Sequence, residues 1–163
     1  MELFGALWPG EYAWKLDVEF VRTRGFEPYD LWETTVPIPK PGTLVNLTNR
    51  WELTNQTVEL IGFAAPNREF TGDFRWIGKW WGENRDKVFS LAVKLGPKAQ
   101  PNRLTLVRAV DENEATAKLM QHASQDDPCQ VFFLKPAQDA TELRLTFAVQ
   151  RSRSVQFVAR PDF

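Results

Sequence analysis

The clearest pattern along the chain is an alternation of apolar and polar residues. In residues 12–22, YAWKLDVEFVR, the even positions carry Tyr12, Trp14, Leu16, Val18 and Phe20. Charged residues stand between most of them. Because successive side chains of a strand point to opposite faces, this segment is expected to be a strand with one buried and one wet face. Antiparallel sheets show that pattern, whereas fully covered parallel sheets do not.

The same alternation recurs at residues 89–95, 143–150 and 155–159. Weaker strand signals lie at residues 32–38, 44–47, 51–53, 58–63, 103–110 and 130–134. Short stretches rich in Gly, Pro, Asn and Asp separate them and predict turns. About nine or ten short strands at this spacing predict an all-β fold. We expect a single antiparallel β-sandwich over residues 1–163, of an immunoglobulin-like or jelly-roll-like type.

Residues 112–124 are the only segment with a helical alternative. Ala115, Leu119 and Ala123 would share one helix face at a spacing of four residues. The competing interpretation is a turn over residues 111–114 followed by another strand. A reversal rich in Asp, Glu and Asn directly after a strand favours the second interpretation. The fold is therefore predicted to contain at most one short helix, near residues 112–124.

Composition narrows the range of functions. The chain has 163 residues, 43% of them hydrophobic, including seven tryptophans and twelve phenylalanines, so it can fill a core without disulfides or metal. A formal net charge of −1 argues against a dedicated nucleic-acid binder, which would carry a basic excess. One cysteine, Cys129, and one histidine, His122, exclude an intrachain disulfide and a Cys/His zinc site. No cofactor is expected.

The tryptophan-rich stretch at residues 74–87, FRWIGKWWGENRDK, is the strongest candidate for a binding site. Exposed indole faces stack on sugar rings, and neighbouring cations supply hydrogen bonds. The candidate ligand-binding residues are Trp76, Trp80 and Trp81 with Arg75, Lys79 and Arg85 around them. The alternative is that the indoles plug one end of the sandwich. Both interpretations stay open, because adjacent Trp80 and Trp81 would point to opposite sides of an extended backbone.

No pattern in the sequence identifies catalytic or metal-ligating residues. The chain contains no G-x-S-x-G, no phosphate-cradling glycine loop and no H-E-x-x-H. The acidic residues of two predicted turns are expected to be solvated rather than to bind calcium; they are Asp111, Glu112, Glu114, Asp126 and Asp127. Asp17 and Glu19 are expected to be solvated on the polar face of the first strand, His122 to lie at the surface and Cys129 to pack. The chain is therefore not expected to be an enzyme.

The function predicted from these features is a non-catalytic interaction module that binds another protein or forms part of a larger assembly. A carbohydrate-binding module that uses the tryptophans is the first alternative, and a carboxylate-dependent hydrolase is the second. Exposed sheet edges would also allow weak self-association. No stretch reaches the roughly 20 apolar residues of a membrane span. The N-terminal stretch does not resemble a signal peptide, so a cytoplasmic location is the default, or an extracytoplasmic one if the chain is a piece of a longer protein.

Overall fold

The fold is known from a computed structural model that describes residues 14–21, 25–53, 56–70, 87–96, 103–124, 129–150 and 152–159. Within these ranges the regular structure is β-strand apart from one 3-10 turn, η1 (Pro28–Asp30). The strands are β1 (Trp14–Val21), β2 (Leu31–Pro37), β3 (Leu44–Asn46), β4 (Arg50–Leu53), β5 (Gln56–Ala64), β6 (Phe89–Leu95), β7 (Arg103–Asp111), β8 (Lys118–Ser124), β9 (Cys129–Lys135), β10 (Glu142–Gln150) and β11 (Ser152–Ala159).

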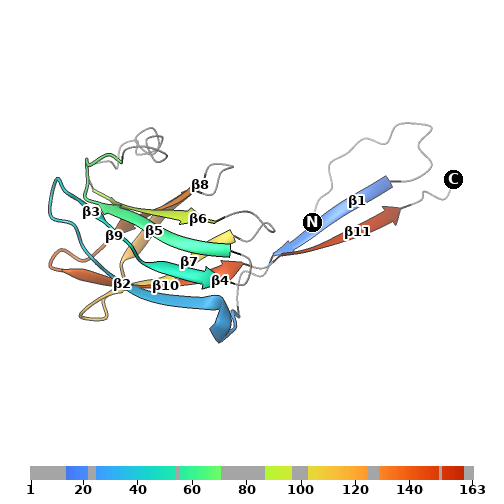
Figure 1. Ribbon diagram of the computed structural model, residues 1–163, viewed down its shortest axis with the longest axis horizontal. Coiled ribbons are helices and arrows are strands. Elements are labelled where there is room, and N and C mark those ends of the chain that lie inside the picture. The colour runs from blue at the N-terminus through green and yellow to red at the C-terminus, as the bar shows by residue number, and fades with distance from the viewer. Residues whose placement is uncertain are drawn as a thin grey trace.

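Nine of these strands form two antiparallel sheets. The small sheet has three strands in the order β2-β10-β7. The large sheet has six strands, in the order β3-β5-β6-β9-β8 with β4 also paired to β5. The apolar side chains of both sheets meet in one buried cluster, and Figure 1 shows the two sheets as layers of one body. The predicted all-β antiparallel sandwich is confirmed.

A row of aromatic rings links the two layers of the body. Trp32 and Phe147 of the small sheet stack with ring centroids 5.7 Å apart. Trp32 also stacks on Trp51 of β4 at 5.8 Å, and Phe147 meets Phe132 of β9 edge-on at 5.6 Å. Such pairs contribute about 0.5–1.5 kcal/mol each beyond the area that they bury. The row therefore helps to fix how the sheets sit on each other.

The central strands β6 and β9 of the large sheet are buried on both faces. The inner face of the sheet contributes to the core of the sandwich, and its outer face carries a second apolar cluster. This outer cluster consists of Ala64, Phe70, Val88, Ala92, Cys129, Val131 and Phe133. Because both faces are covered, residues 129–134 are all buried, and the sequence of β9 is a nearly continuous apolar run instead of an alternation.

The turn interpretation of residues 111–114 is confirmed, and the helical alternative is wrong. The Glu114 N–H donates to the Asp111 carbonyl at 3.1 Å, and β8 begins at Lys118. The Asp111 carboxylate accepts hydrogen bonds from the Asn113 and Ala115 N–H groups at 2.9 and 2.8 Å. An acidic side chain that caps its own turn in this way competes with a helix, which explains the reversal.

Strands β1 and β11 belong to neither sheet. They pair antiparallel with each other over eight residue pairs, from Trp14 with Ala159 to Val21 with Ser152, and form a two-stranded ribbon. In Figure 1 this ribbon extends away from the body. Phe20 is 56% exposed and Phe157 is 47% exposed. The prediction that the first strand buries its apolar face is wrong at Phe20, because alternation identifies the apolar face but not whether a second layer covers it.

Candidate functional site

The tryptophan-rich candidate site lies outside the described residues. Arg75, Trp76, Lys79, Trp80, Trp81 and Arg85 all fall within residues 71–86, so their prediction stands untested. The residues that flank this segment are described. Phe70 and Val88 are only 6% and 5% exposed, and both belong to the outer cluster of the large sheet. The residues on either side of the segment are therefore fixed at that face.

A glycine makes room for the first of these two anchors. Gly62 lies at a register shift in the pairing of β5 with β6. A β-carbon at Gly62 would lie 3.1 Å from Cε1 of Phe70 and 3.2 Å from the Val45 carbonyl oxygen, closer than ordinary van der Waals contact. A glycine inside a strand pattern is a signal for a bulge or a close approach. That signal was present in the sequence LIGFA but did not reveal which side chain approaches.

The acidic turn after β7 uses its carboxylates to hold the body together. Glu112 Oε1 accepts hydrogen bonds from the N–H and the Oγ1 of Thr141 at 3.0 and 2.9 Å. A hydrogen bond from its own backbone N–H and those from Thr141 lower the pKa of the Glu112 carboxyl from its ordinary value of 4.5. Since Thr141 directly precedes β10, this contact ties the turn to the neighbouring strand of the small sheet.

Glu114 is held by two arginines from adjacent strands. Arg144 of β10 and Arg108 of β7 both donate to its carboxylate, Arg108 at a distance of 2.9 Å. The hydrogen bond from Arg144, followed by its charge, lowers the pKa of the Glu114 carboxyl from 4.5. Each described acid of the turn is therefore engaged by its own neighbours. Within the described ranges no group of three or more His, Cys, Asp or Glu side chains could hold a metal ion, and Asp126 and Asp127 lie outside them.

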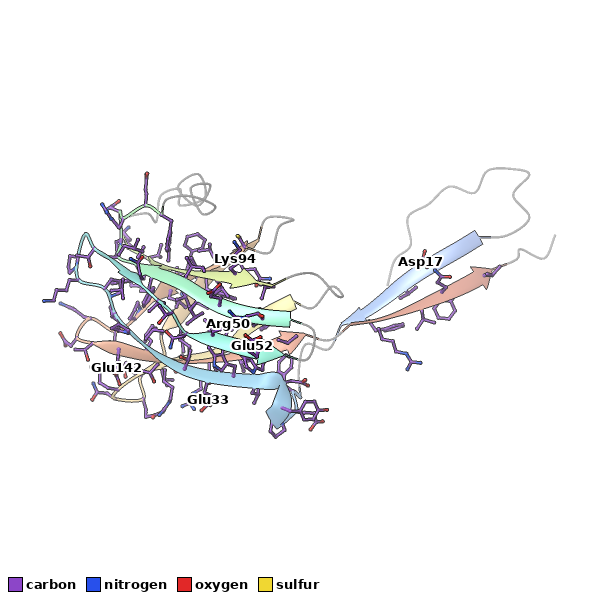
Figure 2. The ribbon with its side chains drawn as sticks, viewed as in Figure 1. Asp17, Glu33, Arg50, Glu52, Lys94 and Glu142 are labelled. Atoms are coloured by element: carbon purple, nitrogen blue, oxygen red, sulfur yellow. The ribbon has the colours of Figure 1, made fainter. Side chains whose placement is uncertain are left out.

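Other acidic side chains are spread over different elements. Figure 2 shows Asp17 on the ribbon, apart from Glu33, Glu52 and Glu142 of the body. On β4, Arg50 donates to Glu52, which also accepts a hydrogen bond from Thr57 at 3.0 Å. The side chains of Glu19 and His122 lie outside the described part of the structure. The labelled carboxylates thus give no sign of the close pair that a glycosidase needs.

The ribbon carries a distinct apolar face. Directly paired residues of an antiparallel pair lie on the same face. One face therefore holds positions 14, 16, 18 and 20 of β1 with positions 153, 155, 157 and 159 of β11, which are all apolar except for Arg153. The other face holds Lys15, Asp17 and Glu19 with mostly polar partners. Sequence reasoning found the alternation in each strand but not that the two strands pair with each other.

Exposed apolar side chains gather on this ribbon. Seven large apolar side chains of the described residues are exposed, and three of them, Phe20, Phe157 and Val158, are on β1 and β11. The other four are distributed over η1, β7 and β8; they are Tyr29, Val107, Leu119 and Met120. Cys129, by contrast, is buried in the outer cluster, as expected of a packing residue. The ribbon is the described feature that most resembles a binding surface.

Comparison with known proteins assigns no function to the chain. In the described ranges, no helix has the length and apolar character needed to cross a lipid bilayer. Comparison with protein-family models, with curated protein sequences and with solved structures finds no significant match.

Proposed function

We propose that this chain is a non-catalytic β-sandwich module that binds another protein chain through its β1–β11 ribbon. The observation that carries this proposal is the exposure of Phe20 and Phe157 on the apolar face of the ribbon. Apolar faces of this kind on a soluble surface are characteristic of protein interaction sites.

The marginal stability of a lone ribbon supports the same proposal. Two strands without a third strand or a covering layer are marginally stable at best in water. Neither sheet of the body pairs with β1 or β11 among the described residues, so the ribbon gains no stability from a longer ladder. A bound partner would supply the missing layer. The body, with its two buried apolar clusters, would act as the rigid support.

The type of sandwich is part of the proposal. We propose an immunoglobulin-like arrangement for the body, in which strands far apart in the chain pair in one sheet. The support is the small sheet, where β10 lies between β2 and β7. Such an arrangement implies no particular activity, so the proposed function rests on the ribbon alone.

A site-specific cross-linking experiment tests the proposed function. A photoreactive amino acid at position 157 should cross-link a partner chain, either a protein from the source cells or a second copy. The same group at Thr35, an exposed position on β2, should not. The partner is then purified, and its binding should be lost in Phe157→Lys. Equal cross-linking from both positions, or none from position 157, would refute a ribbon-based function.

A carbohydrate-binding module is the second candidate. It is favoured by the burial of Phe70 and Val88, which places the residues on either side of the tryptophan-rich segment at the outer face of the large sheet. Titration with a panel of polysaccharides should then change the tryptophan fluorescence, and Trp80→Ala or Trp81→Ala should abolish the change. Absence of any response across the panel would remove this candidate. No observation on the described residues favours the hydrolase alternative.

A further inference from the structure

We infer that the partner of the ribbon is a second copy of this chain, and that two ribbons pack apolar face against apolar face about a two-fold axis. This inference rests on the proposed function of the ribbon as an interaction element. It goes further by naming the occupant of the apolar face and the symmetry of the contact. A two-fold contact uses the same patch on both copies, so the patch must be complementary to itself.

The rest of the described chain offers no comparable apolar surface to receive the ribbon. The outer face of the small sheet carries exposed Glu33, Thr35 and Arg144. The outer cluster of the large sheet is buried. The remaining exposed apolar side chains lie on three separate elements, η1, β7 and β8. The face of another ribbon is therefore the best match for the ribbon's apolar face within this molecule.

The charges of the ribbon allow such self-association. In β1 and β11 the two cations Lys15 and Arg153 balance the two anions Asp17 and Glu19, a sum of zero. Three of these four residues occupy the face opposite the apolar one, where they would stay in water in a face-to-face pair. Only Arg153 lies on the apolar face, in the pair with Phe20 at the body end of the ribbon. No like charges are forced together at the centre of the contact.

The projection of the ribbon from the body makes an antiparallel arrangement of two copies sterically feasible. Figure 1 shows the ribbon extending beyond both sheets, so two ribbons in an antiparallel overlap would hold their bodies at opposite ends. In this arrangement Phe157, which pairs with Leu16 near the far end of its own ribbon, would lie opposite the half of the second ribbon that is next to its body. The Phe157 ring of one copy would therefore lie near Phe20 of the other copy, and both rings belong to the contact.

The size of the face predicts a weak and reversible dimer. Eight residues at about 3.3 Å each give strands of roughly 27 Å, and two strands with their side chains are roughly 10 Å wide. The footprint is then about 270 Å² per copy, well below the roughly 800 Å² per partner of a standard stable interface. The dimer should accordingly dissociate on dilution and form at high concentration.

The test is to measure the monomer–dimer equilibrium of the full chain by sedimentation over a concentration series. Substitutions at two adjacent residues serve as a matched pair. Phe157 and Val158 are both exposed but occupy opposite faces of the ribbon. Phe157→Lys should weaken dimerisation about 100-fold, since the change occurs twice in a two-fold interface at roughly tenfold each. Val158→Lys should leave the dimer within about threefold of the wild type. Phe20→Lys, at the other end of the same face, should weaken it as Phe157→Lys does.

Hydrogen exchange gives a second measurement that does not depend on substitutions. The amides of residues 14–21 and 152–159 should exchange more slowly as the concentration rises, whereas those of β5, β6 and β9 should not change. The melting temperature of the body should be nearly the same in all variants. Such a result would show that the substitutions weaken the contact of the ribbon and do not unfold the body.

Two outcomes overturn the inference. One is a wild-type protein that stays monomeric at the highest concentration reached. The other is a dimer that Phe157→Lys and Phe20→Lys leave intact, because such a dimer would use another surface. A monomeric wild type leaves the proposed function standing. That function fails only if the cross-linker at position 157 also captures no ribbon-dependent partner.

Discussion

Strand β9 and strand β1 show how differently the two parts of the molecule treat apolar residues. The β9 sequence CQVFFL has almost no alternation, and every residue in it is buried. The β1 sequence alternates cleanly, yet Phe20 on its apolar side is 56% exposed. A continuous apolar run thus reports two covered faces, whereas clean alternation reports one face that stays in water. The alternating pattern does not tell which layer, if any, covers the apolar face of the strand.

The largest expected effect separates the core of the body from the ribbon. Phe147 is fully buried and contacts Trp32 and Phe132, so Phe147→Ala should lower the free energy of unfolding by about 3–5 kcal/mol. Phe20→Ala, its control on the ribbon, should cost less than about 1 kcal/mol when measured on dilute protein. Urea unfolding followed by tryptophan fluorescence measures both. Equal losses would show that the ribbon is part of the cooperative core.

A second prediction concerns the two faces of β9. Phe132 points into the sandwich core, and its neighbour Phe133 belongs to the outer cluster. Because both rings are at most 3% exposed, Phe132→Ala and Phe133→Ala should each cost about 3–5 kcal/mol. On the ribbon, the substitutions Phe157→Ala and Val158→Ala should each lower the free energy of unfolding of the dilute protein by less than about 1 kcal/mol. A loss below about 1 kcal/mol in Phe133→Ala would mean that the outer cluster is not a second core.

Most strands could be predicted from the sequence because local pattern determines them. Residues 58–63, 103–110 and 130–134 were predicted as strands and lie within β5, β7 and β9. The turn over residues 111–114 was also predictable, since the Asp111 carboxylate accepts hydrogen bonds from backbone N–H groups within four residues of its own position. Such contacts depend on neighbours in the sequence, which a pattern can report.

Long-range partners could not be predicted in the same way. The pairing of β1 with β11 joins residues at opposite ends of the chain, and nothing in either strand specifies the other. The burial of Phe70 against Gly62 likewise depends on a loop that folds back over its own strand. The candidate site could be proposed only from residue type, because Trp76, Trp80 and Trp81 lie close together in the sequence. Their exposure depends on what packs above them, which no local pattern contains.

A third prediction tests the anchor of the tryptophan-rich segment. In Gly62→Ala the added methyl group would press on the Phe70 ring and the Val45 carbonyl, which should cost about 1–3 kcal/mol. Gly42→Ala is the matched control, because Gly42 has a φ of +73° and nothing within 4 Å of an added β-carbon. Its cost should be only the roughly 1 kcal/mol of a left-handed backbone. Thermal unfolding measures both variants. A larger loss in Gly42→Ala would contradict close packing at Gly62.

The smallest expected effect comes from the polar contact that ties the ends of β7 and β10. The pKa of Glu112 is lowered in the folded protein, and both its hydrogen bonds from Thr141 favour the charged form. A depressed carboxyl pKa stabilises the fold above the unfolded value of 4.5, and this stabilisation disappears as the pH falls through the folded value. Glu112→Gln should therefore lower the melting temperature slightly at pH 7 and have progressively less effect below about pH 4.5.

Thr141→Val separates the hydrogen bonds from the charge itself. This substitution removes the hydroxyl donor at 2.9 Å but keeps the backbone N–H donor at 3.0 Å, so the Glu112 pKa should rise part of the way back toward 4.5. Its melting temperature should fall between those of the wild type and Glu112→Gln at pH 7, and all three should converge in acid. Melting curves that stay parallel from pH 7 to pH 3 would mean that the contact adds nothing to the stability of the body.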